Sequence, residues 1–153
     1  VMLSFVEQIS DDSETAELHP RSNRFWKIES LPGLELLKNL GEHYLDYAFG
    51  LVLAADDLFV NLSKRMDFFA VAEFILQKHS DAIAASRILT SVEHSENVSL
   101  ADLTYLKWLY EIGYRRFMLS DGLCRREESF NRAMSAMKEF VEYVGEEVGN
   151  VSE

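Results

Sequence analysis

The sequence predicts an α/β fold built from parallel strands that alternate with helices, and three observations lead to this. Apolar runs of about four to eight residues alternate with longer segments in which apolar residues recur with a period near 3.6. The run 47–54 is almost continuously apolar, which is typical of a strand buried on both faces of a parallel sheet. No linker rich in Pro, Gly or Ser interrupts the 153 residues, so we expect one domain over residues 1–153.

Local signals place the individual elements. Pro20 and its polar neighbours indicate a loop over 19–23. Pro32 stands in the first turn of the helix that Ser30 opens, where a missing N–H costs little, and Gly113 is a suitable helix end. The predicted strands are 1–6, 24–29, 47–54, 82–89 and 116–119, and the predicted helices are 11–18, 30–44, 66–78, 100–112 and 127–148.

This order of elements implies parallel strands that are joined by right-handed crossovers. A closed (β/α)8 barrel needs at least about 200 residues, and the chain has 153. We therefore expect about five βα units of a TIM (β/α)8-type barrel, incomplete in this chain. Such a partial barrel would expose strand edges, so we expect either a homo-oligomer or a part of a larger chain.

Composition restricts the function. The 26 acidic residues outnumber the 15 basic ones and give a formal net charge of -11, which disfavours nucleic acid and anionic membranes as partners. Cys124 is the only cysteine, so a reducing compartment is expected, and the apolar runs are too short to span a membrane. We expect a cytoplasmic protein that binds a small anionic substrate.

Charged residues end two successive predicted strands. Lys27 and Glu29 are two residues apart, which places them on one face of a strand, and Asp56 and Asp57 end the next strand. Since chemistry in βα proteins gathers at the carboxyl ends of strands, a lysine beside two carboxylates could hold a divalent metal and an anion. The plainer interpretations are a surface ion pair worth at most about 1 kcal/mol and helix capping by the aspartates.

Five segments occur in the order and rough spacing of a known pattern. K-I-E-x-x-x-G matches 27–33. With substitutions, A-R-G-D-L corresponds to 54–58, A-T-Q-M-L-E-S to 85–91, I-M-L-S-G-E-T to 117–123 and A-S-F-I to 3–6. With these motifs the chain resembles the second half of the pyruvate kinase catalytic barrel.

The resemblance implies a role for each matching residue. Lys27 would stabilise charge on the transferred phosphoryl group and on the enolate oxygen of phosphoenolpyruvate or pyruvate. Glu29 and Asp57 would hold Mg²⁺ or Mn²⁺, which prefer oxygen ligands. Ser86 would keep a hydroxyl near the substrate. Asp56 and Asp57 would also contact the substrate. A K⁺ ion is implied only if the missing strands are supplied.

The chain also departs from this family. Ala55-Asp56 replaces Arg-Gly, Arg87 replaces Gln, and neither the first three barrel strands nor the lid and regulatory domains are in this chain. One alternative is a metal-dependent lyase of the citrate-lyase/HpcH type that releases pyruvate, although its strand end reads Q-I-E-T where this chain has Lys27. A third hypothesis is a degenerate, non-catalytic barrel module that serves assembly or regulation.

Overall fold

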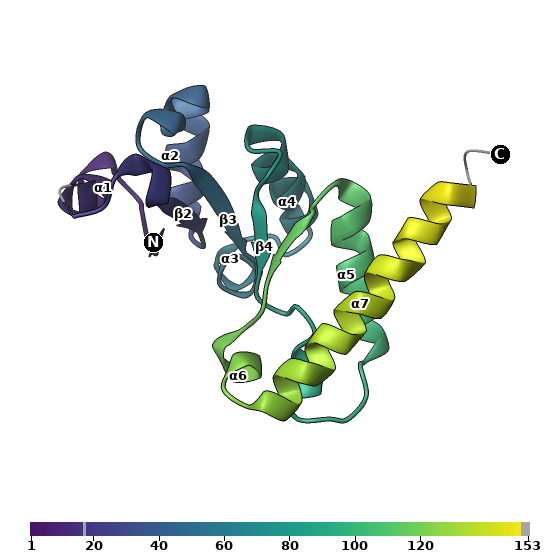
Figure 1. Cartoon of the computed structure of the whole chain (residues 1–153). Helices are drawn as coiled ribbons and strands as arrows, with labels where there is room; N and C mark the ends of the chain where they lie inside the picture. Colours follow the sequence, from purple (N-terminus) through teal and green to yellow (C-terminus); the bar gives the residue numbers. More distant parts are fainter. Residues whose placement is uncertain (17, 151–153) are drawn as a thin grey trace. The chain divides into compact units, whose positions relative to one another are not determined.

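The chain forms a five-stranded parallel sheet in which the strands lie in sequence order (Figure 1). We describe residues 1–16 and 18–150 of a computed structural model. The strands are β1 (Met2–Leu3), β2 (Phe25–Ile28), β3 (Gly50–Ala54), β4 (Ile83–Ala85) and β5 (Arg116–Met118). The predicted α/β fold with parallel βα units is confirmed, and closure into a barrel stays a prediction.

The described part of the chain also contains seven α-helices and three short 3-10 helices. The α-helices are α1 (Ile9–Ala16), α2 (Leu31–Leu40), α3 (Ala55–Asn61), α4 (Asp67–Lys78), α5 (Leu100–Ile112), α6 (Asp121–Cys124) and α7 (Glu127–Asn150). The 3-10 helices are η1 (Arg21–Asn23), η2 (Gly41–Asp46) and η3 (Thr90–Glu93).

The chain divides into two compact units. The first unit comprises Val1–Ser86 and Trp108–Met118 and contains the whole sheet. The second unit comprises Arg87–Lys107 and Leu119–Glu153, in which α7 packs on α6 and η3.

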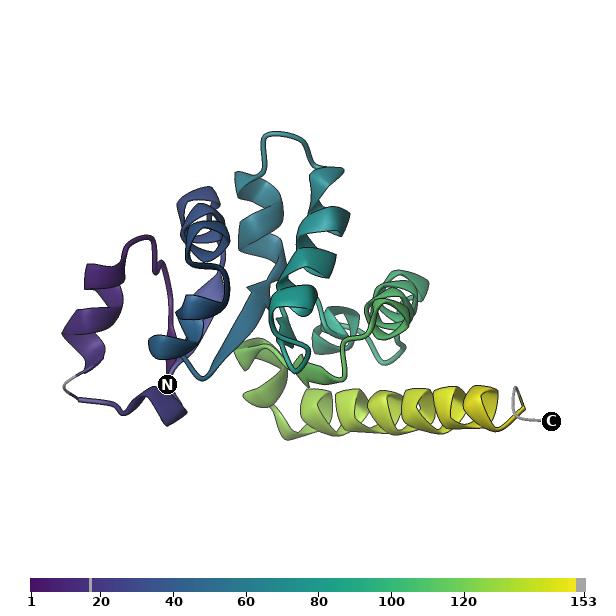
Figure 2. The ribbon, with the colours of Figure 1, turned by 90° about the horizontal axis from the view of Figure 1, so that it is seen from above.

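The sequential strand order decides how the first unit is layered. Because successive parallel strands are joined by crossovers of one hand, the connecting helices lie on one side of the sheet, as α2 and α4 do in Figure 2. Strand register aligns Ile28, Leu53 and Ala84, all of which are buried in the core. The alternate positions Lys27, Val52 and Ile83 are also aligned, on the opposite face.

Local interactions fasten the loop after β1 to the start of α2. The Ser30 hydroxyl caps α2 by accepting a hydrogen bond from the Gly33 N–H at 3.2 Å. A Cβ at Gly33 would lie only 3.0 Å from the Val6 carbonyl oxygen, so a larger residue there would push the two backbones apart by a few tenths of an ångström. The two segments that follow β1 and β2 are thereby packed against each other.

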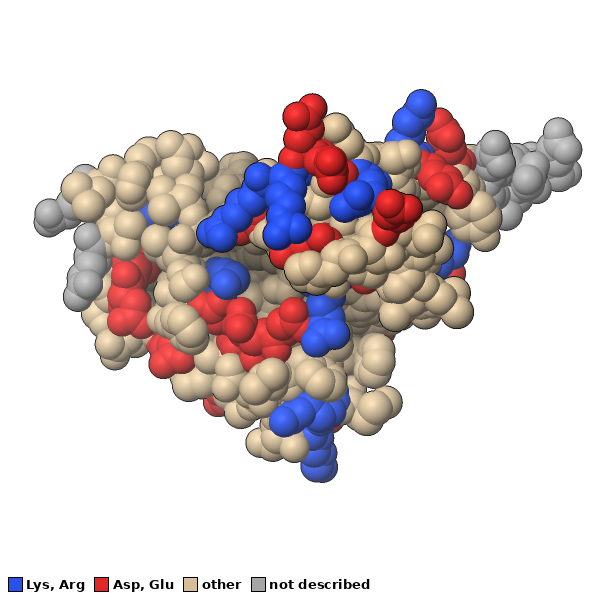
Figure 3. Space-filling model, turned by 90° about the horizontal axis from the view of Figure 1, so that it is seen from below, with Lys and Arg blue, Asp and Glu red and all other residues tan. Residues whose placement is uncertain are grey.

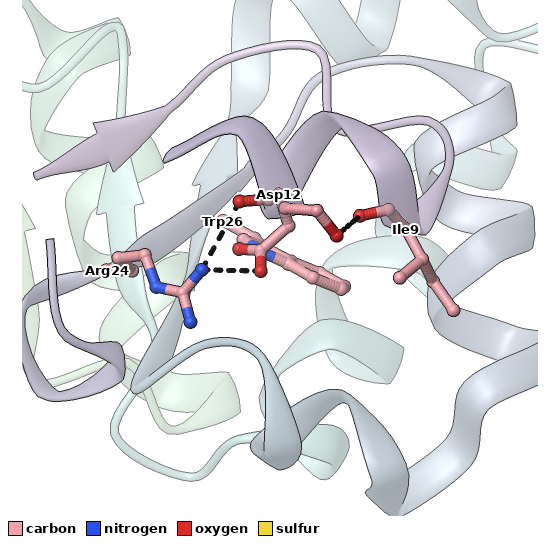
Figure 4. A network of polar contacts seen from close by, with 5 residues as sticks. Ile9, Asp12, Arg24 and Trp26 are labelled. Carbon is pink, nitrogen blue, oxygen red and sulfur yellow. Dashed lines mark hydrogen bonds and ion pairs between the residues drawn. The ribbon is translucent and has the colours of Figure 1, made fainter. Parts of the chain in front are cut away.

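A buried polar group attaches α1 to β2 (Figure 4). The Asp12 carboxylate contacts Arg24 Nη1 at 2.5 Å and accepts a hydrogen bond from Trp26 Nε1 at 2.8 Å. All three side chains are buried, so the ion pair is shielded from water. The helix that the sequence predicted over 11–18 is therefore anchored through one of its own carboxylates.

Several predicted boundaries differ from those of the structure. The fourth strand was predicted over 82–89 but ends at Ala85, because Ser86, Arg87 and Leu89 have φ values of 68°, 57° and 55°, which no strand contains. The helix predicted over 30–44 ends at Leu40, where Gly41 with φ 57° lets the chain continue as η2. Residues 55–61 form α3, which is not among the predicted helices. The strand predicted over 1–6 pairs with β2 only over Met2–Leu3.

The described helices include none that is both long and apolar enough to cross a membrane. On the face drawn in Figure 3, Lys and Arg side chains lie among Asp and Glu side chains rather than apart from them.

Candidate functional site

The candidate site lies where β2 and β3 end. Lys27 is the third residue of β2, and Glu29 directly follows the strand. The next strand ends at Ala54 and leads without a loop into α3, whose first turn contains Asp56 and Asp57. Parallel pairing of Ile28 with Leu53 brings these two strand ends to the same edge of the sheet.

Ion pairs join three of the predicted site residues. Lys27 Nζ lies 2.7 Å from Glu29 Oε2 and 3.7 Å from Asp57 Oδ2. The exposed fractions of these side chains are 23% for Lys27, 1% for Glu29 and 53% for Asp57. One ammonium group thus links a fully buried carboxylate to one that faces water.

The charge state of Lys27 follows from these contacts. Burial lowers its pKa, but the hydrogen bond and the negative charge of Glu29, together with Asp57, outweigh this, so that the pKa lies above its ordinary value of 10.5. Lys27 is therefore a cation at neutral pH. The site offers a positive charge with negative groups on two sides.

Two further residues hold Glu29 and α3 in place, and the sequence analysis did not identify them. The Phe5 N–H donates to Glu29 Oε1 at 2.8 Å, from a backbone with a φ of 54°. Asn61 Nδ2 donates to the Glu29 carbonyl at 3.1 Å and to the Asp57 carbonyl at 2.9 Å. Phe5 contributes through its backbone N–H, so its residue type does not indicate the contact. Asn61 stands in a triplet that resembles a glycosylation site, and nothing else in the sequence singles it out.

The loop after β1 is fixed above this strand end by a second contact. The Ser30 hydroxyl donates to Glu7 Oε1 at 2.6 Å, while the Phe5 N–H reaches Glu29. Through the Phe5 contact this loop lies against Glu29, whose side chain is only 1% exposed.

The remaining predicted residues lie at the same edge of the sheet. Asp56 is half-buried in the first turn of α3. Ser86 is half-buried directly after β4, and its positive φ turns the chain out of the strand direction. The ion-pair group itself comprises Lys27, Glu29 and Asp57.

The donor set fits a divalent metal only together with further oxygen ligands. Among the residues that the structure describes, no group of three or more His, Cys, Asp or Glu side chains could hold a metal ion. Mg²⁺ is commonly bound through one or two carboxylates, with water and substrate oxygens completing the coordination. Glu29 and Asp57 match this type of site, in which an oxygen-rich anion supplies the other ligands.

A second polar group lies at the opposite, amino-terminal ends of the strands. The Tyr44 hydroxyl donates to the Lys78 carbonyl at 3.0 Å and lies 2.9 Å from His79 Nδ1. Burial raises the pKa of Tyr44 to about 12 and, with a smaller effect of Arg116, lowers the pKa of His79. Since ligands bind beyond the carboxyl ends in parallel sheets, we assign this group a structural role.

Comparison with known proteins leaves the family open. No family model matches the chain, and no curated protein matches it either.

Proposed function

We propose that this chain is a pyruvate kinase-like, divalent-metal-dependent phosphotransferase domain that acts on phosphoenolpyruvate or pyruvate through an enolate. The observation that carries the proposal is the ion-pair group, in which Lys27 contacts both Glu29 and Asp57. The Lys27 ammonium is flanked by two carboxylates. This arrangement suits an anionic ligand that is bound both by the ammonium and by a metal ion on the carboxylates.

Each residue has a part in this chemistry. Lys27 would donate hydrogen bonds to the enolate oxygen and offset the negative charge that develops there. The buried Glu29 and the exposed Asp57 would hold Mg²⁺ or Mn²⁺, which supplies charge neutralisation at the substrate oxygens when bound. The Phe5 and Asn61 contacts would keep Glu29 and α3 oriented, which reduces reorganisation on binding.

Phosphoryl transfer requires more than this group. In the resembled family the upstream strands carry the monovalent-cation ligands and a phosphate-binding arginine. We therefore propose transfer only for an assembly in which such strands come from the same polypeptide or from a partner. Binding of the metal and of an enolate-like anion needs only Lys27, Glu29 and Asp57.

The test is a calorimetric titration of the protein with Mn²⁺, with and without oxalate as a mimic of the pyruvate enolate. We expect oxalate to tighten Mn²⁺ binding, because the dianion supplies the ligands that two carboxylates leave open. Glu29→Gln and Asp57→Asn should each weaken Mn²⁺ binding at least about tenfold, because an amide replaces a charged oxygen ligand.

Asp81→Asn is the matched control. This carboxylate pairs with Arg116 at 2.8 Å but lies before β4, away from the strand carboxyl ends. Its substitution should leave Mn²⁺ binding unchanged. Binding that persists in both site variants, or is lost equally in the control, would refute the proposed metal site.

Two alternatives are separated by the same protein samples. Release of pyruvate from a 4-hydroxy-2-oxo acid without nucleotide would identify the lyase. If Mn²⁺ does not bind at millimolar concentration, the non-catalytic module is the hypothesis that remains. That third hypothesis draws on Asp56, which adds a negative charge where the resembled family has glycine.

A further inference from the structure

The long helix α7 has two apolar stripes, of which only one is used within its own unit. The buried stripe is formed by Ser129, Ala133, Ala136, Phe140 and Val144. It faces its own unit, where the Ser129 hydroxyl donates to the Leu123 carbonyl and Arg132 donates to the Val92 carbonyl. Packing on α6 and η3 therefore accounts for this stripe.

The second stripe begins one residue further along and faces outward. Phe130, Met134 and Val141 are exposed, and Met137 is half-exposed. These four positions, which we call the α7 seam, are separated by four, three and four residues. Apolar residues at this spacing form the contact between two paired helices. On a helix face that contacts only water, the same spacing would not stabilise the protein.

The seam is self-complementary when two copies run antiparallel. Pairing about a two-fold axis through the middle of the seam places Phe130 opposite Val141 of the second copy and Met134 opposite Met137. A large ring then meets a small side chain, and two adaptable methionines fill the centre. A parallel pair would instead place Phe130 on Phe130 and Val141 on Val141.

Charge along the helix favours the same orientation. Within α7, residues 127–138 carry two acidic and two basic side chains, whereas residues 139–145 carry Glu139 and Glu142 and no basic one. In an antiparallel pair the acidic segment of each helix lies beside the neutral half of the other. In a parallel pair the two acidic segments would lie side by side and repel each other.

From these observations we propose that the α7 seam binds the α7 seam of a second copy of this chain, in an antiparallel two-fold dimer. This interface is independent of the proposed metal site. The seam covers about two heptads, so the dimer is expected to dissociate within a measurable concentration range, roughly micromolar.

Sedimentation velocity over a range of protein concentrations tests the interface. Met134→Glu should raise the dimer dissociation constant at least about tenfold, because it buries an unpaired carboxylate in the seam. Met66→Glu is the control, since Met66 is also an exposed methionine but precedes α4 in the other unit. A chain that stays monomeric throughout, or a dimer that both variants weaken equally, would overturn the proposal.

Disulfide trapping tests the orientation. In a Cys124→Ser background, Phe130→Cys and Val141→Cys chains should cross-link when mixed, while neither variant cross-links alone. In the antiparallel pair the two copies of position 130 are separated by about 16 Å along the helix axis, too far for a disulfide. Cross-linking of each single variant with itself would indicate a parallel pair and overturn the proposed geometry.

Discussion

Replacing Lys27 by methionine should destabilise the protein strongly while leaving the shape of the side chain nearly unchanged. The substitution removes the ammonium that lies 2.7 Å from Glu29 Oε2. The Glu29 carboxylate, only 1% exposed, would keep its hydrogen bond from the Phe5 N–H but would lose its counter-charge. A buried charge without a partner is among the most costly defects in a folded protein.

The size of the effect follows from the exposure of the partners. Breaking a buried ion pair costs about 3 to 5 kcal/mol, and we expect about 3 kcal/mol here because Lys27 is 23% exposed and water can enter in its place. The contact with Asp57 at 3.7 Å adds less than about 1 kcal/mol, since that carboxylate is half exposed. The free energy of unfolding is measured by urea denaturation, followed through the fluorescence of the buried Trp26.

Two further variants make the measurement decisive. Lys78 is similarly exposed, at 26%, but its partner Glu42 is 75% exposed, so Lys78→Met should cost less than about 1 kcal/mol. Adding Glu29→Gln to Lys27→Met should recover most of the loss, because no buried charge is then left. Equal costs for Lys27→Met and Lys78→Met would refute the reasoning.

Three other perturbations test the first unit. Asp12→Ala should lower the free energy of unfolding by about 3 to 5 kcal/mol, because Arg24 is left as a buried cation, and Asp12→Ala with Arg24→Leu should cost less in the same urea assay. Because the pKa of His79 is lowered in the fold, the unfolded chain binds its proton more readily, so stability is complete above about pH 6.5 and falls at lower pH. Unfolding curves at pH 7.5 and 5.5 should show this fall, and His79→Gln should reduce it. Asn61→Ala should cost about 1 to 2 kcal/mol and speed amide hydrogen exchange in α3, since two hydrogen bonds to carbonyl groups are lost; unchanged exchange would contradict the role of Asn61.

The parallel sheet could be predicted because apolar periodicity is strong in this chain. The almost unbroken apolar run before Ala55 contains β3, and the helix predicted over 100–112 matches α5. What failed were boundaries that depend on backbone conformation. The chain leaves the β region at Ser86 and Arg87 without glycine, so no residue type announced the end of β4.

The proximity of Lys27, Glu29 and Asp57 was predictable from strand spacing, whereas the supports of the site were not. Residues two apart on a strand share a face whatever the rest of the fold does. By contrast, the contact from Phe5 uses a backbone N–H that is 24 residues away in sequence, and any residue except proline could supply it. The metal and substrate roles of the three side chains stay predictions.

The sequential strand order also has a kinetic consequence. Partner residues in neighbouring strands are separated by 23 positions for Met2 and Phe25 and by 33 positions for Ile83 and Arg116. Loop closure over these distances differs by only about 0.3 kcal/mol, so loop entropy alone favours no strand pair as the first to form. As far as this entropy decides, folding can begin at any adjacent pair and extend to the strands beside it. Loss of an edge unit would shorten the sheet without shifting the register of the strands that remain.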